Sequence, residues 1–276
     1  MRSSSEVTTV SREAKPSNEP TEDVAAGDQE ALASSDLEQL LENLKLTRMA
    51  EVLDRELARM RSEGHGPRVL LARMLREQWQ ARQETSKKYR ITAAKIPELL
   101  SLETFPYDRQ TSVRRALIEE LATLEFVAQG QNLVFIGGPG RGKTGLATGL
   151  LLRALRAGHR GRFVKAQDLF DELYSSLADR SSRTLLNQLV RLPLMVVDEM
   201  GYLNLRPEQS NLFFRLMEER YTKRVATIIT TNLDFPQWYE FLGNKPMVQA
   251  LLDRLRHRCI EIRLEGPSLR DPENLG

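Results

Sequence analysis

Eight consecutive residues near the middle of the chain have the composition and spacing of a phosphate-binding loop. They read Gly137-Gly138-Pro139-Gly140-Arg141-Gly142-Lys143-Thr144 and follow the apolar run 132–136. Glycines let backbone N–H groups surround phosphate oxygens, and the start of the helix expected after them adds a positive dipole end. Lys143 can reach the β- and γ-phosphates, and the Thr144 hydroxyl can ligate Mg²⁺. The residues from Gly137 to Gly145 therefore predict a site for a nucleoside triphosphate.

A pair of acidic residues ends a second apolar run. Asp198 and Glu199 directly follow the segment 194–197, which reads Leu-Met-Val-Val. If this segment is a central strand, its end presents both carboxylates at the sheet edge where the phosphate loop lies. Asp198 would then complete the Mg²⁺ ligands with Thr144, and Glu199 would orient and polarise the attacking water. The pair favours an ATPase over a small-molecule kinase and over a nucleotide switch that does not hydrolyse.

Two further polar residues could complete the site. Asn232 follows the buried-strand pattern 225–230, where its amide could hydrogen-bond the γ-phosphate or the attacking water; a turn cap is the alternative. Arg254 lies in a helical pattern near the C-terminus and has no obvious route to its own phosphate loop. It could act across a subunit boundary as an arginine finger. Because Arg256 and Arg258 follow closely, a plain basic surface is the alternative interpretation.

Charge is unevenly distributed along the 276 residues, whose net charge is +2. Residues 1–36 hold three basic and eight acidic side chains, a net charge of −5, which leaves +7 on the remainder. This excess suggests contact with a polyanion. Cys259 is the single cysteine, so no intramolecular disulfide can form, and no apolar run is long enough to cross a bilayer. We therefore expect a cytoplasmic protein.

Composition divides the chain into three parts. Residues 1–35 are rich in Ser, Glu, Pro and Thr and are expected to form a disordered tail. Residues 36–96 are expected to form a helical domain with helices at about 47–62 and 67–93. The second of these carries seven basic residues against two acidic ones, with Trp79 and Tyr89 interleaved, which is a candidate nucleic-acid surface or a solvated face. The basic residues are Arg68, Arg73, Arg76, Arg82, Lys87, Lys88 and Arg90.

Residues 97–276 alternate between strand and helix patterns, which predicts an α/β fold with a parallel sheet between helices. The strands are expected at 132–136, 162–166, 194–198, 225–230 and 259–264. The helices are expected at 109–127, 143–157, 168–178, 182–191, 207–222, 236–241 and 246–257.

With these motifs in order, the chain resembles the IstB/DnaC branch of the AAA+ ATPases, and specifically the IstB-type transposition helpers. The resemblance covers roughly residues 37–270. Besides the phosphate loop, it rests on Leu44-Lys45-Leu46-Thr47-Arg48-Met49-Ala50, Ala94-Lys95-Ile96-Pro97, Asp198-Glu199-Met200-Gly201-Tyr202, Glu219-Arg220-Tyr221, Thr231-Asn232-Leu233, Leu252-Asp253-Arg254-Leu255 and Glu265-Gly266-Pro267-Ser268-Leu269-Arg270.

The resemblance implies an AAA+ P-loop NTPase core behind a small all-α N-terminal domain. It also implies an ATP-dependent, DNA-binding oligomer that hydrolyses ATP and directs or activates a partner transposase at a target site, with active sites between subunits. By the family pattern, Asn232 is the sensor asparagine, Arg254 is the finger in trans and Arg270 is a further phosphate-proximal arginine. The paired helices at 168–191 would line the DNA path. Candidate phosphate contacts there and nearby are Arg160, Arg162, Arg180, Arg183 and Arg191.

The chain departs from the family pattern at three positions. Gly145 follows the Lys-Thr pair where a polar residue is usual, Arg141 replaces a small residue in the loop, and Leu269 replaces a tyrosine. Gly145 costs up to about 1 kcal/mol of helix stability relative to alanine but should spare phosphate binding. A DnaC-like replicative helicase loader is the alternative function, because it shares the same ATPase module.

Overall fold

The structure is a computed structural model that describes residues 35–201, 203–243 and 246–270. The predicted tail, residues 1–35, lies almost entirely outside the described residues. The chain divides into two compact units, residues 1–83 and 84–276, and the boundary falls within helix α3 (Pro67–Ala93). Within the described residues, no helix is both long enough and apolar enough to cross a membrane.

The N-terminal unit contains a short helix at residues 35–43, helix α2 (Thr47–Glu63) and the first part of α3. The helices predicted at 47–62 and 67–93 are confirmed. α2 ends at Gly64, whose φ of +67° is the left-handed conformation that glycine adopts without steric cost. A small core joins these helices, and its buried residues are Leu41, Met49, Leu53 and Met74.

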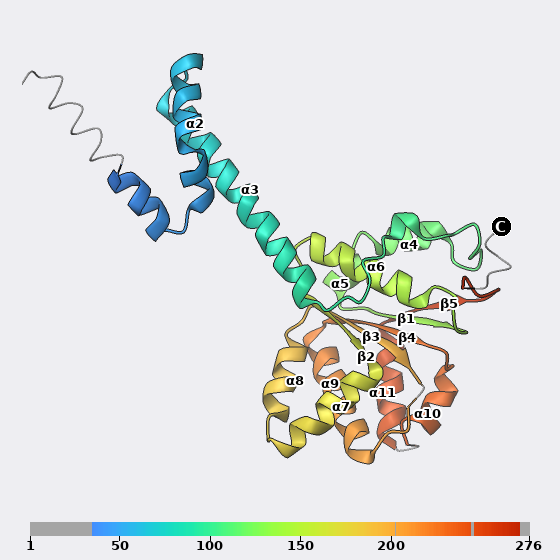
Figure 1. The fold of residues 1–276 in the computed structure, drawn as a ribbon. Helices are drawn as coiled ribbons and strands as arrows, with labels where there is room; N and C mark the ends of the chain where they lie inside the picture. The colour runs from blue at the N-terminus through green and yellow to red at the C-terminus, as the bar shows by residue number, and fades with distance from the viewer. Residues whose placement is uncertain (1–34, 202, 244–245, 271–276) are drawn as a thin grey trace, which may run out of the picture. The chain divides into compact units, whose positions relative to one another are not determined.

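The second unit is built on a five-stranded parallel sheet with the order β2-β3-β4-β1-β5 (Figure 1). The strands are β1 (Asn132–Gly137), β2 (Gly161–Lys165), β3 (Leu194–Met200), β4 (Ala226–Thr231) and β5 (Cys259–Leu264). All five predicted strands are present. β1, β3 and β4 are almost entirely buried, because a parallel sheet in this position is covered on both faces; β1 and β3 are mostly apolar, whereas half of β4 is threonine.

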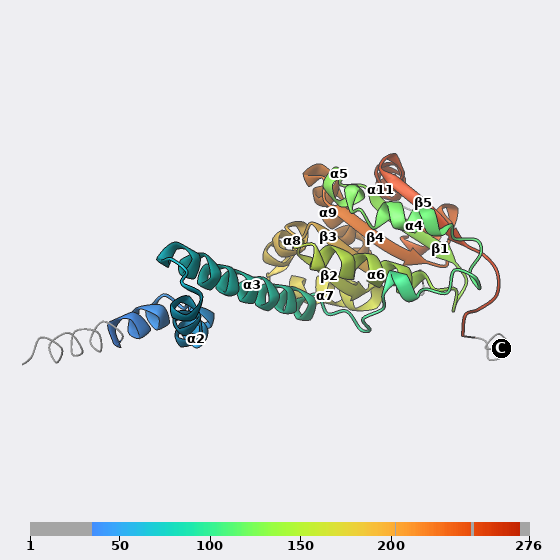
Figure 2. The same ribbon diagram turned by 90° about the horizontal axis from the view of Figure 1, so that it is seen from above.

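Helices cover the two faces of the sheet in separate layers, one on each side of the strands in Figure 1; Figure 2 looks onto the face that α4 and α6 cover. One layer holds α4 (Arg115–Leu121), α5 (Glu125–Gln129) and α6 (Lys143–Arg156); the other holds α7 (Ala166–Ala178), α8 (Ser182–Val190), α9 (Pro207–Lys223), α10 (Trp238–Phe241) and α11 (Pro246–His257). The alternation along β1 matches these layers. Leu133 and Phe135 pack into the core beside α6, whereas Val134 and Ile136 pack into the core beside α7 to α11.

One predicted helix is wrong. The segment 109–127 forms a loop followed by two short helices, α4 and α5, rather than one continuous helix. Gln110 is buried in this loop. Its side-chain Nε2 donates a 3.0 Å hydrogen bond to the carbonyl of Arg141. Farther on, Leu124 adopts a left-handed φ of +69°, which ends the first helix and starts the second in a new direction. The helix predicted at 236–241 is likewise split, into a 3-10 turn (Phe235–Gln237) and α10.

Candidate active site

The phosphate loop connects β1 to α6, as its sequence predicts. Gly140 and Gly142 have φ values of +72° and +91°, so the loop needs glycine at both positions. Gly142 is the residue before the first turn of α6. Since the first N–H groups of a helix lack partners within it, this turn directs hydrogen-bond donors and a positive dipole end into the loop. The predicted geometry for binding phosphate is therefore present.

Lys143 lies across the loop. Its Nζ donates 2.7 Å hydrogen bonds to the carbonyls of Gly137 and Gly138. Burial lowers the pKa of Lys143, with the nearby Asp198 carboxylate opposing that effect. The guanidinium of Arg141 lies against Gly138 and donates a 3.1 Å hydrogen bond to the Leu264 carbonyl. The loop is thus tied to the end of β5.

Asp198 and Thr144 are brought together at the predicted sheet edge. Thr144 Oγ1 donates a 2.9 Å hydrogen bond to Asp198 Oδ1, and Thr230 Oγ1 donates one of 2.5 Å to the same oxygen. Asp198 is 2% exposed, and burial raises the pKa of its carboxyl group, while the two threonine hydrogen bonds act in the opposite direction. A carboxylate and a hydroxyl from two different elements therefore meet beside the phosphate loop, as a shared Mg²⁺ site requires.

Glu199 sits in a β-bulge at the end of β3. Val197 pairs with Ile229 and Met200 with Thr231, so Asp198 and Glu199 together lie opposite the single residue Thr230. Glu199 adopts a left-handed φ of +60°, which is unusual for a residue with a side chain. Its N–H donates a 3.0 Å hydrogen bond to Thr230 Oγ1. The bulge interrupts the regular alternation of side chains between the two faces of the sheet, so the directions of the Asp198 and Glu199 side chains are set separately.

The glutamate carboxylate has a partner that sequence reasoning missed. Glu199 Oε2 lies 3.2 Å from Nζ of Lys165, the last residue of β2. Thr230, which bonds to both Asp198 and the backbone of Glu199, was also missed. Thr230 directly precedes Thr231-Asn232 at a strand end, so its sequence position could have indicated a place in the site. The sequence around Lys165 gives no such indication, because only the pairing of β2 with β3 brings Lys165 near Glu199.

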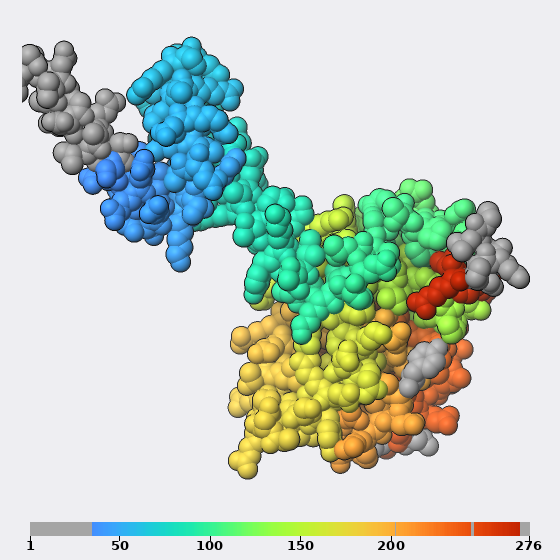
Figure 3. Space-filling view, in the orientation of Figure 1, coloured from blue at the N-terminus to red at the C-terminus, as the bar shows by residue number. Residues whose placement is uncertain are grey.

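A cleft of about 310 Å³ opens beside the phosphate loop. The C-terminal segment Ser268–Arg270 closes one side of it, with the N–H of Leu269 donating a 2.8 Å hydrogen bond to the Gly140 carbonyl. This segment lies at the molecular surface (Figure 3). Arg270 lines the cleft together with Lys143. The remaining lining residues are Glu98, Leu100, Ser101, Thr104, Phe105, Pro106, Gly140, Arg141, Gly142, Thr144, Gly145 and Leu269.

Asn232 lies one residue beyond β4, at the same sheet edge as the acidic pair. Because Thr231 pairs with Met200, Asn232 comes close to Gly201, and a Cβ on that glycine would lie 3.0 Å from Asn232 Oδ1. This Oδ1 is buried and forms no hydrogen bond within the described residues. A buried acceptor of this kind calls for a donor, and an ordered water is one such donor.

Arg254 lies away from its own phosphate loop. It forms a 3.1 Å ion pair with Glu218 of α9, and it borders a small hollow together with Asn132. Asn132 is the first residue of β1, whereas Gly137 at the other end of the strand begins the loop. At about 3.3 Å per residue, the two ends of β1 are roughly 16 Å apart. Arg254 therefore cannot serve its own site without a large rearrangement.

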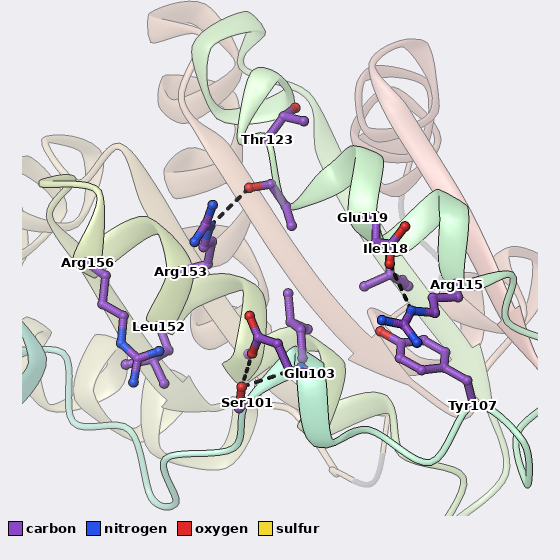
Figure 4. A pocket seen from close by; sticks show the side chains of 13 residues that line it. Ser101, Glu103, Tyr107, Arg115, Ile118, Glu119, Thr123, Leu152, Arg153 and Arg156 are labelled. Atoms are coloured by element: carbon purple, nitrogen blue, oxygen red, sulfur yellow. Dashed lines mark hydrogen bonds and ion pairs between the residues drawn. The ribbon is translucent and has the colours of Figure 1, made fainter.

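A second cavity of about 310 Å³ lies between α4 and α6 (Figure 4). Two of its arginines have partners: Arg115 pairs with Glu119 at 2.8 Å, and Arg153 donates to the Ala122 carbonyl at 3.4 Å. Glu103 accepts from Ser101. No residue of the phosphate loop lines this cavity, whereas residues 140–145 line the other cleft, so the cleft beside the loop remains the candidate active site.

Comparison with known proteins places this geometry in a family. The model of the IstB-like ATP binding proteins matches residues 39–275. The chain belongs to the IstB-like family. It is 33% identical over 235 residues to an ATP-binding protein of insertion sequence IS21 from Pseudomonas aeruginosa, covering 85% of this chain and 88% of that protein. It is 34% identical over 200 residues to an ATP-binding protein of insertion sequence IS5376 from Geobacillus stearothermophilus, covering 72% and 79%.

Solved structures confirm the fold of this IstB-like chain. The crystal structure of the DnaC helicase loader matches with a TM-score of 0.52 and 25% identity, covering 60% of this chain and 96% of that one. The replication initiator DnaA, solved with AMPPCP and single-stranded DNA, matches with a TM-score of 0.52 and 17% identity, covering 62% and 52%. The second unit is therefore an AAA+ P-loop NTPase fold, and the resemblance that the sequence predicts is confirmed.

Proposed function

We propose that this chain is an ATP-dependent DNA-binding helper of transposition, which assembles on duplex DNA, hydrolyses ATP and directs or activates a partner transposase. The observation that carries the proposal is the 2.9 Å hydrogen bond between Thr144 and Asp198 beside the phosphate loop, with Glu199 next in the chain, in a chain related to the ATP-binding proteins of insertion sequences. The cofactors are ATP and Mg²⁺.

The residues at the loop suit a triphosphate and its metal. Thr144 and Asp198 would hold Mg²⁺, because a hydroxyl and a carboxylate that already share a hydrogen bond offer it two oxygen ligands. Bound there, the ion would neutralise phosphate charge. The ammonium of Lys143 makes two hydrogen bonds to carbonyls, which phosphate oxygens can replace with stronger, charge-assisted ones.

Hydrolysis requires a base near the attacking water, and Glu199 and Asn232 are the residues that can supply the chemistry. Glu199 can accept a proton from the water, and the unpaired Oδ1 of Asn232 can hold the water in place. Both side chains follow neighbouring strands at the carboxyl edge of the sheet, where ligands bind in open α/β folds. This arrangement supports water, rather than a second substrate, as the phosphoryl acceptor.

The position of Arg254 supports active sites that are shared between subunits. Because it lies at the amino end of the sheet, about one strand length from its own loop, it can reach a γ-phosphate only on a neighbouring copy. Its Glu218 partner keeps the guanidinium at the surface, with 41% of the side chain exposed. An arginine presented in this way suits a finger in trans, and it makes hydrolysis depend on assembly.

Basic side chains on α3 and on the α7–α8 hairpin are the proposed DNA contacts. On α3, Arg68, Arg76, Arg82 and Lys88 form no ion pair with any residue that the structure describes, while Trp79 and Tyr89 are 61% and 75% exposed. Arg180, Arg183 and Arg191 are exposed at or near the ends of α8. Arg162 fits less well, because Glu172 holds it in an ion pair at 2.6 Å. Arg160 is exposed and donates a 3.5 Å hydrogen bond to the Arg191 carbonyl.

A DnaC-like helicase loader is the second candidate, favoured by the structural likeness to DnaC. That likeness covers 60% of this chain, however, whereas the insertion-sequence relative from Pseudomonas aeruginosa is similar over 85% of it. The larger coverage supports the transposition helper.

Phosphate release measured with and without duplex DNA tests the proposed activity, and particle mass measured with ATP and DNA tests assembly. We expect DNA to stimulate release and to yield a complex of several subunits. A protein that stays monomeric and releases no phosphate under these conditions would contradict the proposal. Addition of a purified insertion-sequence transposase, compared with a purified replicative helicase, separates the two candidate partners.

A further inference from the structure

The last turn of α11 carries Arg254, and an exposed ion pair holds this arginine at the surface. Its Nη1 lies 3.1 Å from Glu218 Oε1 of α9, with 41% and 56% of the two side chains exposed. An exposed pair of this kind contributes little to stability. It must also break when the guanidinium reaches a phosphate on a neighbouring copy. Other contacts must therefore hold the end of α11 while Arg254 acts.

Tyr221 makes such contacts. It lies one turn after Glu218 on α9, and its hydroxyl is 3.2 Å from Nδ1 of His257, the last residue of α11. The two rings meet edge to face, with 6.3 Å between their centroids. The guanidinium of Arg258, the next residue, lies 4.9 Å from the centroid of the Tyr221 ring, which is a cation–π contact. One side chain of α9 thus contacts two consecutive residues at the end of α11.

The contacts of Glu218 and Tyr221 are in register. Arg254 and His257 are three residues apart on α11, as Glu218 and Tyr221 are on α9, and residues at this spacing are neighbours on a helix surface. The two helices pack side by side on the same face of the sheet (Figure 1). Tyr221 and Arg254 also line the same small hollow. Tyr221 therefore adjoins Arg254 as well as contacting His257.

Tyr221 extends from a firmly anchored part of α9. The preceding residue, Arg220, is 1% exposed, and its guanidinium donates hydrogen bonds to Thr227 Oγ1 at 3.0 Å and to the Leu189 carbonyl at 2.6 Å. It also donates to the carbonyl of Ala226. These bonds satisfy the buried guanidinium and tie α9 to β4 and to the end of α8. The side chain that supports α11 thus starts from a fixed point of the core.

We propose that Tyr221 is a positioning residue for Arg254. Through its contacts with His257 and Arg258, it holds the last turn of α11 in the orientation from which Arg254 reaches a γ-phosphate on a neighbouring copy. The assignment rests on the proposed function, because it acts through the same arginine in trans. Tyr221 lies with Asn132 at the amino end of the sheet, away from its own phosphate loop. Its loss should therefore lower kcat and leave the KM for ATP unchanged.

Mixed assemblies test this role in one subunit at a time. Glu199→Gln subunits keep Arg254 but should not hydrolyse ATP, so they act as donors; Arg254→Ala subunits lack the finger and act as acceptors. Phosphate release with duplex DNA is measured for equimolar mixtures in which Tyr221→Phe is added to the donor or to the acceptor. We expect a loss in kcat of about two- to tenfold in the donor, because one hydrogen bond is lost, and no change in the acceptor. A defect in folding or in ATP binding would act in both.

Two further donors sharpen the comparison. Lys223→Ala, at the exposed end of α9, is the matched control and should restore turnover as well as the unmodified donor does. His257→Ala removes the partner of the hydroxyl, so in the donor it should lower kcat as Tyr221→Phe does, and the two changes together should lower it no further. Additive losses would show that the two residues act separately and would overturn the proposal.

Chemical modification of His257 tests the contact without turnover. Wild type and Tyr221→Phe are treated with diethyl pyrocarbonate, and the modified histidines are quantified by peptide mass spectrometry. Loss of the hydroxyl contact should raise labelling of His257 by about two- to tenfold and leave that of His159 unchanged. Equal labelling of His257 in the two proteins would show that the contact does not form, which overturns the proposal.

The outcomes separate the positioning role from the wider function. If Tyr221→Phe donors restore turnover as well as Glu199→Gln donors do, the positioning role is wrong and the finger in trans stands. If wild type hydrolyses ATP but no donor restores turnover to Arg254→Ala, the finger in trans and the role of Tyr221 both fail, while the ATPase stands. If wild type releases no phosphate with DNA, the proposed function fails and the positioning role with it. Circular dichroism checks folding, and the His257→Ala donor gives the same test if Tyr221→Phe does not fold.

Discussion

Thr144 and Asp198, which are far apart in sequence, share a 2.9 Å hydrogen bond between hydroxyl and carboxylate at the start of α6. The contact joins the helix after the phosphate loop to the end of β3. It fixes two oxygen atoms where a divalent ion and the phosphates can both reach them. The Asp198 carboxylate is also buried, at 2% exposure, so the residue proposed to hold Mg²⁺ also lowers the stability of the fold through the cost of burying a charge.

The first prediction concerns the effect of the buried Asp198 carboxylate on stability and activity. Asp198→Asn should lower phosphate release by about 100-fold or more, because a charged ligand is lost where charge develops. Without nucleotide it should be as stable as wild type or more stable, since Asn can still accept hydrogen bonds from Thr144 and Thr230. Burial raises the pKa of Asp198, so the free energy of unfolding of wild type falls as pH rises through that pKa. The asparagine variant does not titrate there. Its stability relative to wild type should therefore increase from acidic to neutral pH. Thermal unfolding of both proteins from acidic to neutral pH measures this difference. If the stability of the variant relative to wild type fell over that range, the prediction would be contradicted.

The second prediction concerns Lys143. Lys143→Ala should weaken ATP binding by roughly 10- to 100-fold, because each charge-assisted hydrogen bond contributes about 1.5–3 kcal/mol. Burial lowers the pKa of Lys143, so affinity in wild type should fall as pH rises through that lowered pKa, earlier than an ordinary lysine would allow. Titration with a fluorescent ATP analogue measures both effects. Lys223→Ala is the control. If Lys143→Ala bound ATP with the affinity of wild type, Lys143 would not contribute to ATP binding.

The third prediction concerns Gln110, which connects the loop before α4 to the phosphate loop. Gln110→Ala should destabilise the protein by about 1–3 kcal/mol, because the Arg141 carbonyl loses a donor in a buried setting. It should also weaken ATP binding by loosening the loop. Gln129→Ala, at an exposed position, should change neither quantity. Urea unfolding gives the stability difference; a loss below 0.5 kcal/mol would mean that solvent replaces the bond.

Much of this site could be predicted from local patterns, and the failures have a common cause. The phosphate loop and Asp198-Glu199 were identifiable because glycine spacing and an apolar run ending in acids are properties of neighbouring residues. The sequence predicts a helix at 109–127 that includes Gln110, whereas the hydrogen bond of Gln110 to Arg141 depends on the folded loop. Lys165 is near Glu199 only through the register of β2 with β3. Contacts set by strand pairing leave no trace in local periodicity.

The fourth prediction concerns salt. If Arg180, Arg183 and Arg191 contact DNA phosphates, each alanine variant should weaken binding similarly on different sequences and reduce the slope of log affinity against log salt by about 1. Fluorescence anisotropy with labelled duplexes in the presence of a non-hydrolysable ATP analogue gives the slopes. Lys223→Ala controls for the loss of charge alone. If the slopes of all three arginine variants equal that of wild type, these arginines do not contact DNA phosphates, and α3 is the next surface to test.

The last prediction follows from Arg254 and Asn132 bordering the same hollow at the amino end of the sheet. Because Arg254 is about 16 Å from its own loop by strand length, Arg254→Ala should bind ATP normally yet lose roughly 10³-fold or more in turnover. Glu199→Gln subunits should be inactive but keep an intact Arg254. In a mixture, some Arg254→Ala subunits will have a Glu199→Gln neighbour, whose arginine completes their site, so turnover should partly return. Arg256→Ala, two residues along α11, is the matched control and should need no rescue. No recovery across mixing ratios, with mixed assembly confirmed by mass, would place the role of Arg254 within its own subunit.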